Sequence, residues 1–168
     1  MNKMIAVDAS RCFACRACEI ACAVEHSESK SIVEAMHEKK MPVPRIILEW
    51  TGDQLVPVHC RHCEDAPCVA VCPAGALARS SDNNPVVLDV ALCIGCHACV
   101  VACPFGVITK NPNGKGFIKC DLCVQRLGEG QKPACVEACP TRTIEFEKTD
   151  DVSAAKRKQY LATIQGKE

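Results

Sequence analysis

The spacing of the cysteines constrains this chain more than any other feature. The sequence holds 16 cysteines among 168 residues, and they fall into four sets of four. The first and third sets read C-x2-C-x2-C-x3-C, whereas the second and fourth contain one longer gap. In chain order the sets are Cys12, Cys15, Cys18, Cys22; Cys60, Cys63, Cys68, Cys72; Cys93, Cys96, Cys99, Cys103; and Cys120, Cys123, Cys135, Cys139.

This spacing brings three sulfur atoms into one loop and a fourth sulfur close behind it. It is the pattern that binds [4Fe–4S] clusters, and in two-cluster proteins the fourth cysteine serves the neighbouring cluster. All sixteen cysteines are therefore candidate metal ligands. The sequence predicts four [4Fe–4S] clusters in a chain that carries electrons and catalyses no reaction of its own.

Two other uses of cysteine fit the pattern less well. Disulfide scaffolds are typical of small secreted proteins, but residues 1–11 lead into the first cysteine without a recognisable signal peptide. Zinc sites use two pairs of ligands, whereas these sets consist of triplets followed by a fourth cysteine. A zinc-binding interaction module is the less favoured alternative.

Charge and hydropathy narrow the choice of partners. The chain carries 20 basic and 20 acidic side chains, so it has no basic excess with which to bind nucleic acid. No run of eighteen apolar residues is present, which predicts that the chain does not insert into a membrane. Since iron–sulfur clusters persist best in a reducing compartment, we expect the chain in the cytoplasm.

Short strands and helices are expected around the cysteine loops. Apolar runs predict strands at 3–7, 86–88, 107–109 and 143–146. A hairpin is expected with arms at 45–50 and 54–58 and a turn at Gly52-Asp53. Each fourth cysteine is expected within a short helical stretch, and residues 150–165 favour a C-terminal helix.

The distances between the sets indicate which of them pair. Between Cys72 and Cys93 lie 20 residues, which suits a compact two-cluster unit made from the second and third sets. Between Cys22 and Cys60 lie 37 residues, too many for the same tight arrangement. The first and fourth sets are then left to pair with each other. Sequential pairing, first with second and third with fourth, stays open on this argument.

The predicted fold class is α+β, with two ferredoxin-like [4Fe–4S] modules, one nested within the other, and a C-terminal helix. The outer module comprises residues 1–59 plus 104–149, the inner module 60–103, and the C-terminal helix 150–168. Under this nesting each cluster takes three cysteines from one set and the fourth from its partner set. The four ligand groups are Cys12, Cys15, Cys18 with Cys139; Cys120, Cys123, Cys135 with Cys22; Cys60, Cys63, Cys68 with Cys103; and Cys93, Cys96, Cys99 with Cys72.

Catalytic signatures are missing from the sequence. We find no Ser–His–Asp arrangement, no phosphate-binding glycine loop and no dinucleotide fingerprint. His62 and His97 lie inside ligand loops, where a ring N–H could reach a sulfur atom. Exposed loop positions are nevertheless the expectation for all five histidines, which are His26, His37, His59, His62 and His97.

Three motifs carry a resemblance to a known family. They are Cys60–Cys68 (CRHCEDAPC), Lys119–Cys123 (KCDLC) and Pro133–Thr141 (PACVEACPT). They resemble the four-cluster ferredoxin-type electron-transfer subunits of molybdenum oxidoreductases, formate dehydrogenases, hydrogenases and carbon monoxide dehydrogenases. The resemblance covers nearly all of the chain through Phe146. It implies the nested pairing, a linear row of clusters, and a catalytic redox subunit as partner.

Two segments resemble particular branches of that family. Residues 18–27 are most similar to the CooF-type iron–sulfur partner of carbon monoxide dehydrogenase, whereas residues 152–158 resemble the HycB-type subunit of formate dehydrogenase and hydrogenase. The first resemblance implies a relay between carbon monoxide dehydrogenase and a hydrogenase or other acceptor. The alternative that it leaves is a subunit of a formate dehydrogenase or hydrogenase complex.

Overall fold

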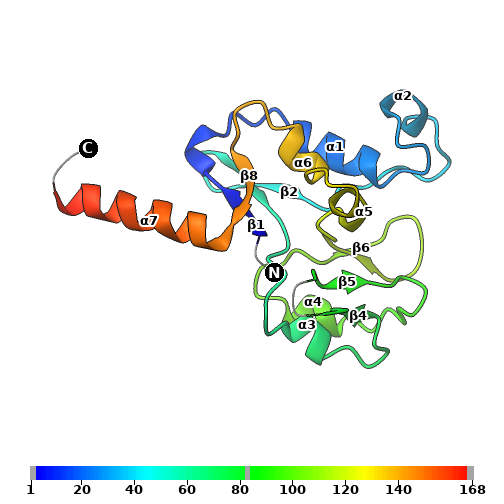
Figure 1. Cartoon of the computed structure of the whole chain (residues 1–168). Coiled ribbons are helices and arrows are strands. Elements are labelled where there is room, and N and C mark those ends of the chain that lie inside the picture. The colour runs from blue at the N-terminus through cyan, green and yellow to red at the C-terminus, as the bar shows by residue number, and fades with distance from the viewer. Residues whose placement is uncertain (1–2, 82–83, 166–168) are drawn as a thin grey trace.

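Short elements joined by the cysteine loops make up the fold, in a computed structural model that describes residues 3–81 and 84–165 (Figure 1). The strands are β1 (Lys3–Val7), β2 (Ile47–Trp50), β3 (Leu55–Val58), β4 (Leu77–Ala78), β5 (Val87–Leu88), β6 (Thr109–Lys110), β7 (Phe117–Ile118) and β8 (Ile144–Lys148). The helices are η1 (Ala9–Arg11, a 3₁₀ turn), α1 (Ala17–Glu25), α2 (Ile32–Ala35), α3 (Pro67–Ala70), α4 (Ala98–Ala102), α5 (Val124–Gly128), α6 (Ala134–Glu137) and α7 (Thr149–Ile164).

One lobe joins the beginning of the chain to its end. Strand β1 pairs antiparallel with β8, with Ile5 opposite Phe146. Helix α1 packs against α6 on the same side of the molecule. Ile5, Ile144 and Leu122 are almost fully buried and form the centre of this lobe's core together with Cys18, Cys22 and Cys135. Residues that are about 140 positions apart therefore share one core.

A second lobe is built from the middle of the chain. Strand β4 pairs with β5 and β6 pairs with β7, both antiparallel. Helix α3 packs against α4. Leu77, Val86 and Phe117 fill the core of this lobe around Cys68 and Cys99. Each lobe thus contains its own small apolar core with cysteine side chains inside it.

A hairpin lies on the first lobe, as expected from the sequence. Strands β2 and β3 pair antiparallel, and Leu48 lies opposite Pro57. Gly52 in the connecting turn has a φ of 104°, a conformation that glycine adopts without strain. Leu48 packs into the core beside Cys18 and Cys22. The hairpin therefore covers the cysteines of the first set.

The predicted strands were confirmed to different degrees. The strand at 3–7 has the predicted bounds, and those at 86–88 and 143–146 are shifted by one or two residues. The strand predicted at 107–109 was wrong in its placement. Val107 and Ile108 are buried but precede β6, which begins only at Thr109. Strands β4 and β7 were not predicted, since two-residue strands show no alternating pattern.

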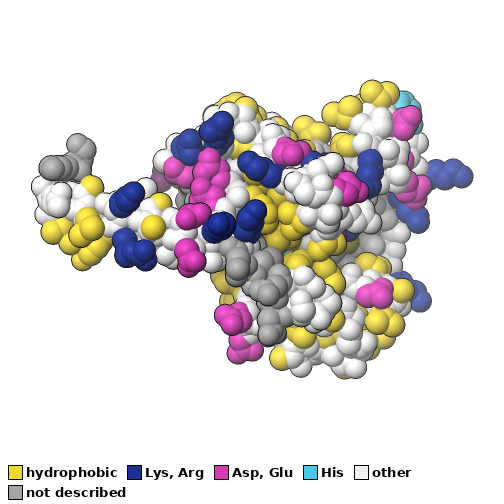
Figure 2. Space-filling model, viewed as in Figure 1, with side chains coloured by type: hydrophobic (Ala, Val, Ile, Leu, Met, Phe, Trp, Pro, Cys, Tyr) yellow, Lys and Arg dark blue, Asp and Glu magenta, His cyan; other side chains and the backbone are white. Residues whose placement is uncertain are grey.

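Helix α7 projects from the body of the protein (Figure 1). It contacts β8 and β1 near its beginning, and none of its residues is buried. Near its far end Tyr160, Leu161 and Ile164 are exposed, where Figure 2 shows hydrophobic side chains gathered. The predicted C-terminal helix is confirmed through Ile164, whereas residues 166–168 lie outside the described part. Within the described residues, none of the helices combines the length and apolar character needed to cross a bilayer.

Candidate iron–sulfur sites

One local structure is repeated in all four cysteine sets. The third cysteine of each set is the second residue of a helix, and these residues are Cys18 in α1, Cys68 in α3, Cys99 in α4 and Cys135 in α6. The residue before the second cysteine has a positive φ in each set, at Ala14, His62, Gly95 and Leu122. The backbone therefore turns sharply between the first two cysteines.

This turn points amide groups at sulfur. The backbone N–H of His62 donates to Cys60 Sγ over 3.4 Å, and the N–H of Leu122 donates to Cys120 Sγ over 3.4 Å. Amide donors stabilise a thiolate that binds metal. In the second and fourth sets, the loop thus stabilises the first cysteine, Cys60 or Cys120, in the thiolate form that binds metal.

The fourth cysteines do not all lie where the sequence predicted. Cys22 is inside α1, as expected. Cys103 directly follows α4 in an extended conformation, and Cys72 and Cys139 lie two residues beyond the ends of α3 and α6. The prediction of a helical position was therefore wrong for these three. The reason is that Pro73, Pro104 and Pro140 follow them, and the residue before a proline avoids helical backbone angles.

Three hollows in the protein are each lined by four cysteines. They enclose about 290, 340 and 310 Å³ of space, part of it open to solvent. In each case three cysteines come from one set and the fourth comes from another. The groups are Cys12, Cys15, Cys18 and Cys139; Cys60, Cys63, Cys68 and Cys103; and Cys72, Cys93, Cys96 and Cys99.

The remaining four cysteines are all buried. They are Cys22, Cys120, Cys123 and Cys135. Burial raises the pKa of the Cys120 and Cys135 thiols far above its ordinary value, and the nearby Cys22 adds to both effects. Burial also raises the pKa of Cys123 to about 11. Thiols that affect one another in this way lie close together in a poorly solvated site.

One compact group of side chains in the described part of the chain could hold a single metal ion. It consists of His26, Asp121 and Cys123, whose ligand atoms lie within 4.8 Å of one another. Zinc sites use four ligands in a tetrahedron, and this group offers three. The three hollows, by contrast, are each lined by four cysteines, the number of ligands that a [4Fe–4S] cluster takes.

Two of the fourth cysteines receive several amide hydrogen bonds. Burial opposes ionisation of Cys72, but the backbone N–H groups of Leu77 and Ala76 lower the pKa of its thiol. At Cys139 burial is likewise outweighed, by the N–H of Ile144 and the hydroxyl of Thr141. Both cysteines are therefore stabilised as thiolates, the form that binds iron.

A polar network supports the Cys22 group, and the sequence did not predict it. Asp121 accepts hydrogen bonds from Arg45 Nη1 at 2.6 Å and from His26 Nε2 at 3.1 Å. Although burial acts against it, the hydrogen bond to Asp121 raises the pKa of His26 to about 9. The backbone N–H of Arg45 also donates to Cys22 Sγ over 3.2 Å. His26 and Asp121 are 95 residues apart, so their contact could not be predicted from the spacing of residues in the sequence.

The expectation of exposed histidines was right for two of the five. His37 and His97 are exposed, and His97 packs edge-on against Phe117. His59 and His62 are buried beside the cysteines of the second set, with exposed fractions of 4% and 5%. His26 is partly buried in the network around Asp121. Lys119 is also buried, and no pattern in the sequence predicts its burial.

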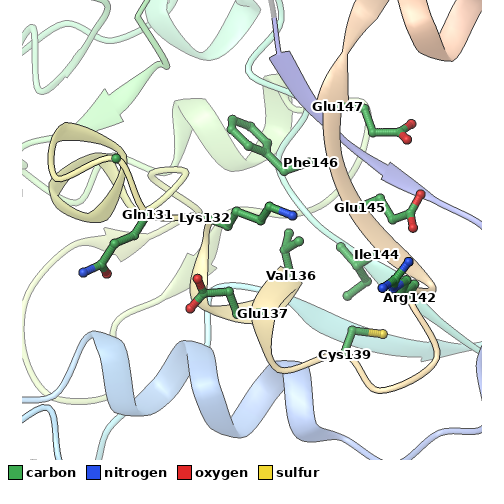
Figure 3. A pocket seen from close by; sticks show the side chains of 11 residues that line it. Gln131, Lys132, Val136, Glu137, Cys139, Arg142, Ile144, Glu145, Phe146 and Glu147 are labelled. Atoms are coloured by element: carbon green, nitrogen blue, oxygen red, sulfur yellow. The ribbon is translucent and has the colours of Figure 1, made fainter.

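A wide cleft opens beside Cys139 (Figure 3). It lies between β8 and the residues that precede α6. Lys132 and Phe146 point into it, whereas Glu145 and Glu147 point to the other side of the strand. Cys139 lines both this cleft and the hollow that contains Cys12, Cys15 and Cys18. The first ligand group is thus next to a concave part of the surface.

Two families of iron–sulfur domains match the sequence. The 4Fe-4S dicluster domain matches residues 52–149, and a 4Fe-4S binding domain matches residues 9–25. The two matches together include all four cysteine sets.

Similar proteins are known from enteric bacteria. The putative electron transport protein YsaA of Escherichia coli is 38% identical over 95% of this chain and 98% of its own length. The thiosulfate reductase electron transfer subunit PhsB of Salmonella typhi is 41% identical over 86% of this chain and 74% of its own. The putative oxidoreductase UacF of Escherichia coli is 41% identical over 99% of this chain, which spans only 25% of UacF.

Proposed function

This chain belongs to the 4Fe-4S dicluster domain family, and we propose that it holds four [4Fe–4S] clusters and relays single electrons between two redox partners. The observation that carries the proposal is the composition of the three hollows. Each contains three cysteines of one set and one of another, which is how two-cluster ferredoxins exchange their fourth ligand.

We assign the ligands accordingly. The first group is Cys12, Cys15, Cys18 and Cys139, and the second is Cys22, Cys120, Cys123 and Cys135. The third is Cys60, Cys63, Cys68 and Cys103, and the fourth is Cys72, Cys93, Cys96 and Cys99. Each bound cluster would supply a site that takes up one electron and gives it back.

The nested arrangement of two ferredoxin modules is part of the proposal. The proposed outer module comprises residues 1–59 and 104–149, and the pairing of β1 with β8 and the packing of α1 on α6 support the joining of its two ends. Within that range, Ile108 and Phe117 pack instead in the core of the second lobe. The packing of α3 on α4 supports an inner module of residues 60–103. Cys60 and Cys120, from different modules, share a buried apolar contact with Val107, which favours a single row of groups through both lobes.

The protein itself contributes ligation, orientation and exclusion of water. Backbone amides donate to the ligand sulfur atoms, and apolar side chains surround the cysteines of both lobes. Burial and hydrogen bonds to sulfur are the means by which a protein sets cluster potentials. YsaA and PhsB are named as an electron transport protein and an electron transfer subunit, consistent with a carrier that is not itself a catalyst.

We further propose that the partner is the catalytic subunit of an oxidoreductase, with carbon monoxide dehydrogenase as the first candidate and formate dehydrogenase or hydrogenase as the alternative. The resemblance of residues 18–27 supports the first candidate. The match to PhsB, a thiosulfate reductase subunit, instead supports a wider range of oxidoreductases. A cytoplasmic location is included in the proposal, since sixteen reduced thiols need a reducing compartment.

The cluster content can be tested on the purified chain. Anaerobic preparation should give a brown protein with roughly 16 iron and 16 sulfide per chain, the content of four cubane clusters. Dithionite should bleach its visible absorption. A folded, colourless chain that contains zinc but no acid-labile sulfide would overturn the proposal. Anaerobic affinity capture from the native cell, with the co-purifying large subunit identified by mass spectrometry, tests the partner.

A further inference from the structure

Lys119 is a buried cation that forms no ion pair with a carboxylate among the described residues. Its exposed fraction is 3%. Its Nζ donates to the backbone oxygens of Val86 and Cys120. Among residues 3–81 and 84–165, no carboxylate oxygen lies within 4.0 Å of this nitrogen. Because burying an uncompensated charge is costly, a negative group is expected nearby when the protein is complete.

His62 lies in the same region and also lacks partners. Neither of its ring nitrogens has a hydrogen-bond partner among the described residues, and both are buried. The His62 side chain lines the hollow formed by the third ligand group, which contains Cys60, Cys63, Cys68 and Cys103. Buried polar groups in proteins are nearly always hydrogen-bonded. A neutral imidazole keeps one N–H, which is available to a sulfur acceptor in that hollow.

Lys119 is anchored beside the same hollow. Its Nζ donates to the backbone oxygen of Val86, and Val86 lines the hollow together with His62 and the four cysteines. Its second hydrogen bond, to the backbone oxygen of Cys120, fixes the ammonium group in this place. The buried lysine and the buried histidine therefore both adjoin the Cys60 group.

We propose that Lys119 and His62 raise the reduction potential of the cluster bound by Cys60, Cys63, Cys68 and Cys103. This inference rests on the proposed function. Reduction adds one electron to a group that is already negative, and a fixed positive charge close by stabilises the reduced form more than the oxidised form. A hydrogen bond to sulfur acts in the same direction. Among the four proposed clusters, the one bound by the Cys60 group would therefore be reduced preferentially.

The test is a potentiometric titration of the full-length chain with reconstituted clusters, followed by electron paramagnetic resonance. Lys119→Gln removes the charge but keeps amide hydrogens for the two carbonyl groups. We expect the reduction equilibrium constant of one cluster to fall tenfold or more, which is 59 mV for one electron. His62→Phe should shift the same signal in the same direction by a smaller amount, and it decides the question should the lysine variant fail to fold.

The matched control is Lys115→Met, which removes the same charge from an exposed position four residues earlier. Water and salt screen that charge, so no signal should shift. Full iron and sulfide with unshifted potentials in both Lys119→Gln and His62→Phe would overturn the inference, as would an equal shift in Lys115→Met. Absence of iron and sulfide from the unaltered chain would instead overturn the proposed function.

Discussion

At the scale of single residues, Cys22 distinguishes the two possible pairings of the cysteine sets. It lies in α1, next to the polar network of Arg45 and Asp121. In the proposed assignment it completes the group in the same lobe, whereas sequential pairing would assign it to the cysteines that begin at Cys60. We expect Cys22→Ala to lose roughly one cluster's worth of iron, about four atoms, and to free Cys120, Cys123 and Cys135.

Alkylation of the iron-loaded protein, read by mass spectrometry, measures which thiols have been freed. The matched control is Cys103→Ala, which should free Cys60, Cys63 and Cys68 instead. If Cys22→Ala released the Cys60 group, sequential pairing would be correct and the nested assignment wrong.

Gly116 is a second residue at which the structure makes a sharp prediction. Its φ is 81°, and a Cβ at this position would lie 2.9 Å from Cys93 Sγ. Gly116→Ala should therefore combine backbone strain of about 1–2 kcal/mol with displacement of a proposed ligand. We expect lower thermal stability and loss of iron from one site. Iron analysis and calorimetry measure the two effects.

Gly130 offers a control for the strain alone. Its φ is 78°, close to that of Gly116, but nothing lies within 4 Å of the Cβ that alanine would add. Gly130→Ala should lose stability without losing iron. Equal iron content in the two alanine variants would contradict a role of Gly116 in giving Cys93 space.

The sequence predicted the chemistry of the cysteines better than that of their surroundings. Cysteine spacing is local, and the loops that it specifies repeat in all four sets. The ion pair between Arg45 and Asp121 joins residues 76 positions apart, and the hydrogen bond from Lys119 to Val86 joins residues 33 positions apart. Polar residues whose partners are distant in the chain do not recur at helix or strand spacing in the sequence. Their burial therefore cannot be predicted from the sequence and is found only in the structure.

At the scale of the elements, the helices that carry ligands are too short to be stable by themselves. Helices α3 and α6 have four residues each and α4 has five, whereas isolated helices need about 12–15 residues to be even marginal in water. The repeated cysteine turns and the packing of α1 on α6 and α3 on α4 hold them in place. Helix propensity therefore could not predict where these short helices begin and end, although the cysteine spacing predicted their approximate positions.

We expect the four cysteine groups to bind their clusters without the long helix α7. It has 16 residues, none of them buried, and it contacts only β8 and β1 among the elements with substantial contacts. Deleting residues 150–168 should leave iron and sulfide unchanged and should alter the free energy of unfolding by about 1 kcal/mol or less. Metal analysis and thermal denaturation check both expectations. Loss of iron from the truncated chain would show that α7 supports the ligand groups after all.

At the scale of the whole molecule, the described residues contain two main apolar cores around cysteine side chains and a third, smaller cluster of Cys60, Val107 and Cys120. The first centres on Ile5, Leu122 and Ile144, and the second on Leu77 and Val86. Several of the surrounding core positions are cysteines, so much of each interior is reserved for the groups that they bind. Sequence composition anticipated this, since 16 cysteines accompany only six aromatic residues in 168.

Folding should consequently depend on the bound clusters in both lobes, because metal binding and folding are coupled when the ligands form the core. We expect oxidative removal of iron with a chelator to abolish hydrogen-exchange protection in β1, β8 and β5, while α7 exchanges rapidly with or without iron. Hydrogen–deuterium exchange measured by mass spectrometry follows each segment separately. Re-addition of iron and sulfide under reducing conditions should restore protection, which separates cluster loss from irreversible damage to the thiols. An iron-free chain that kept its protection in both lobes would mean that the apolar cores alone determine this fold.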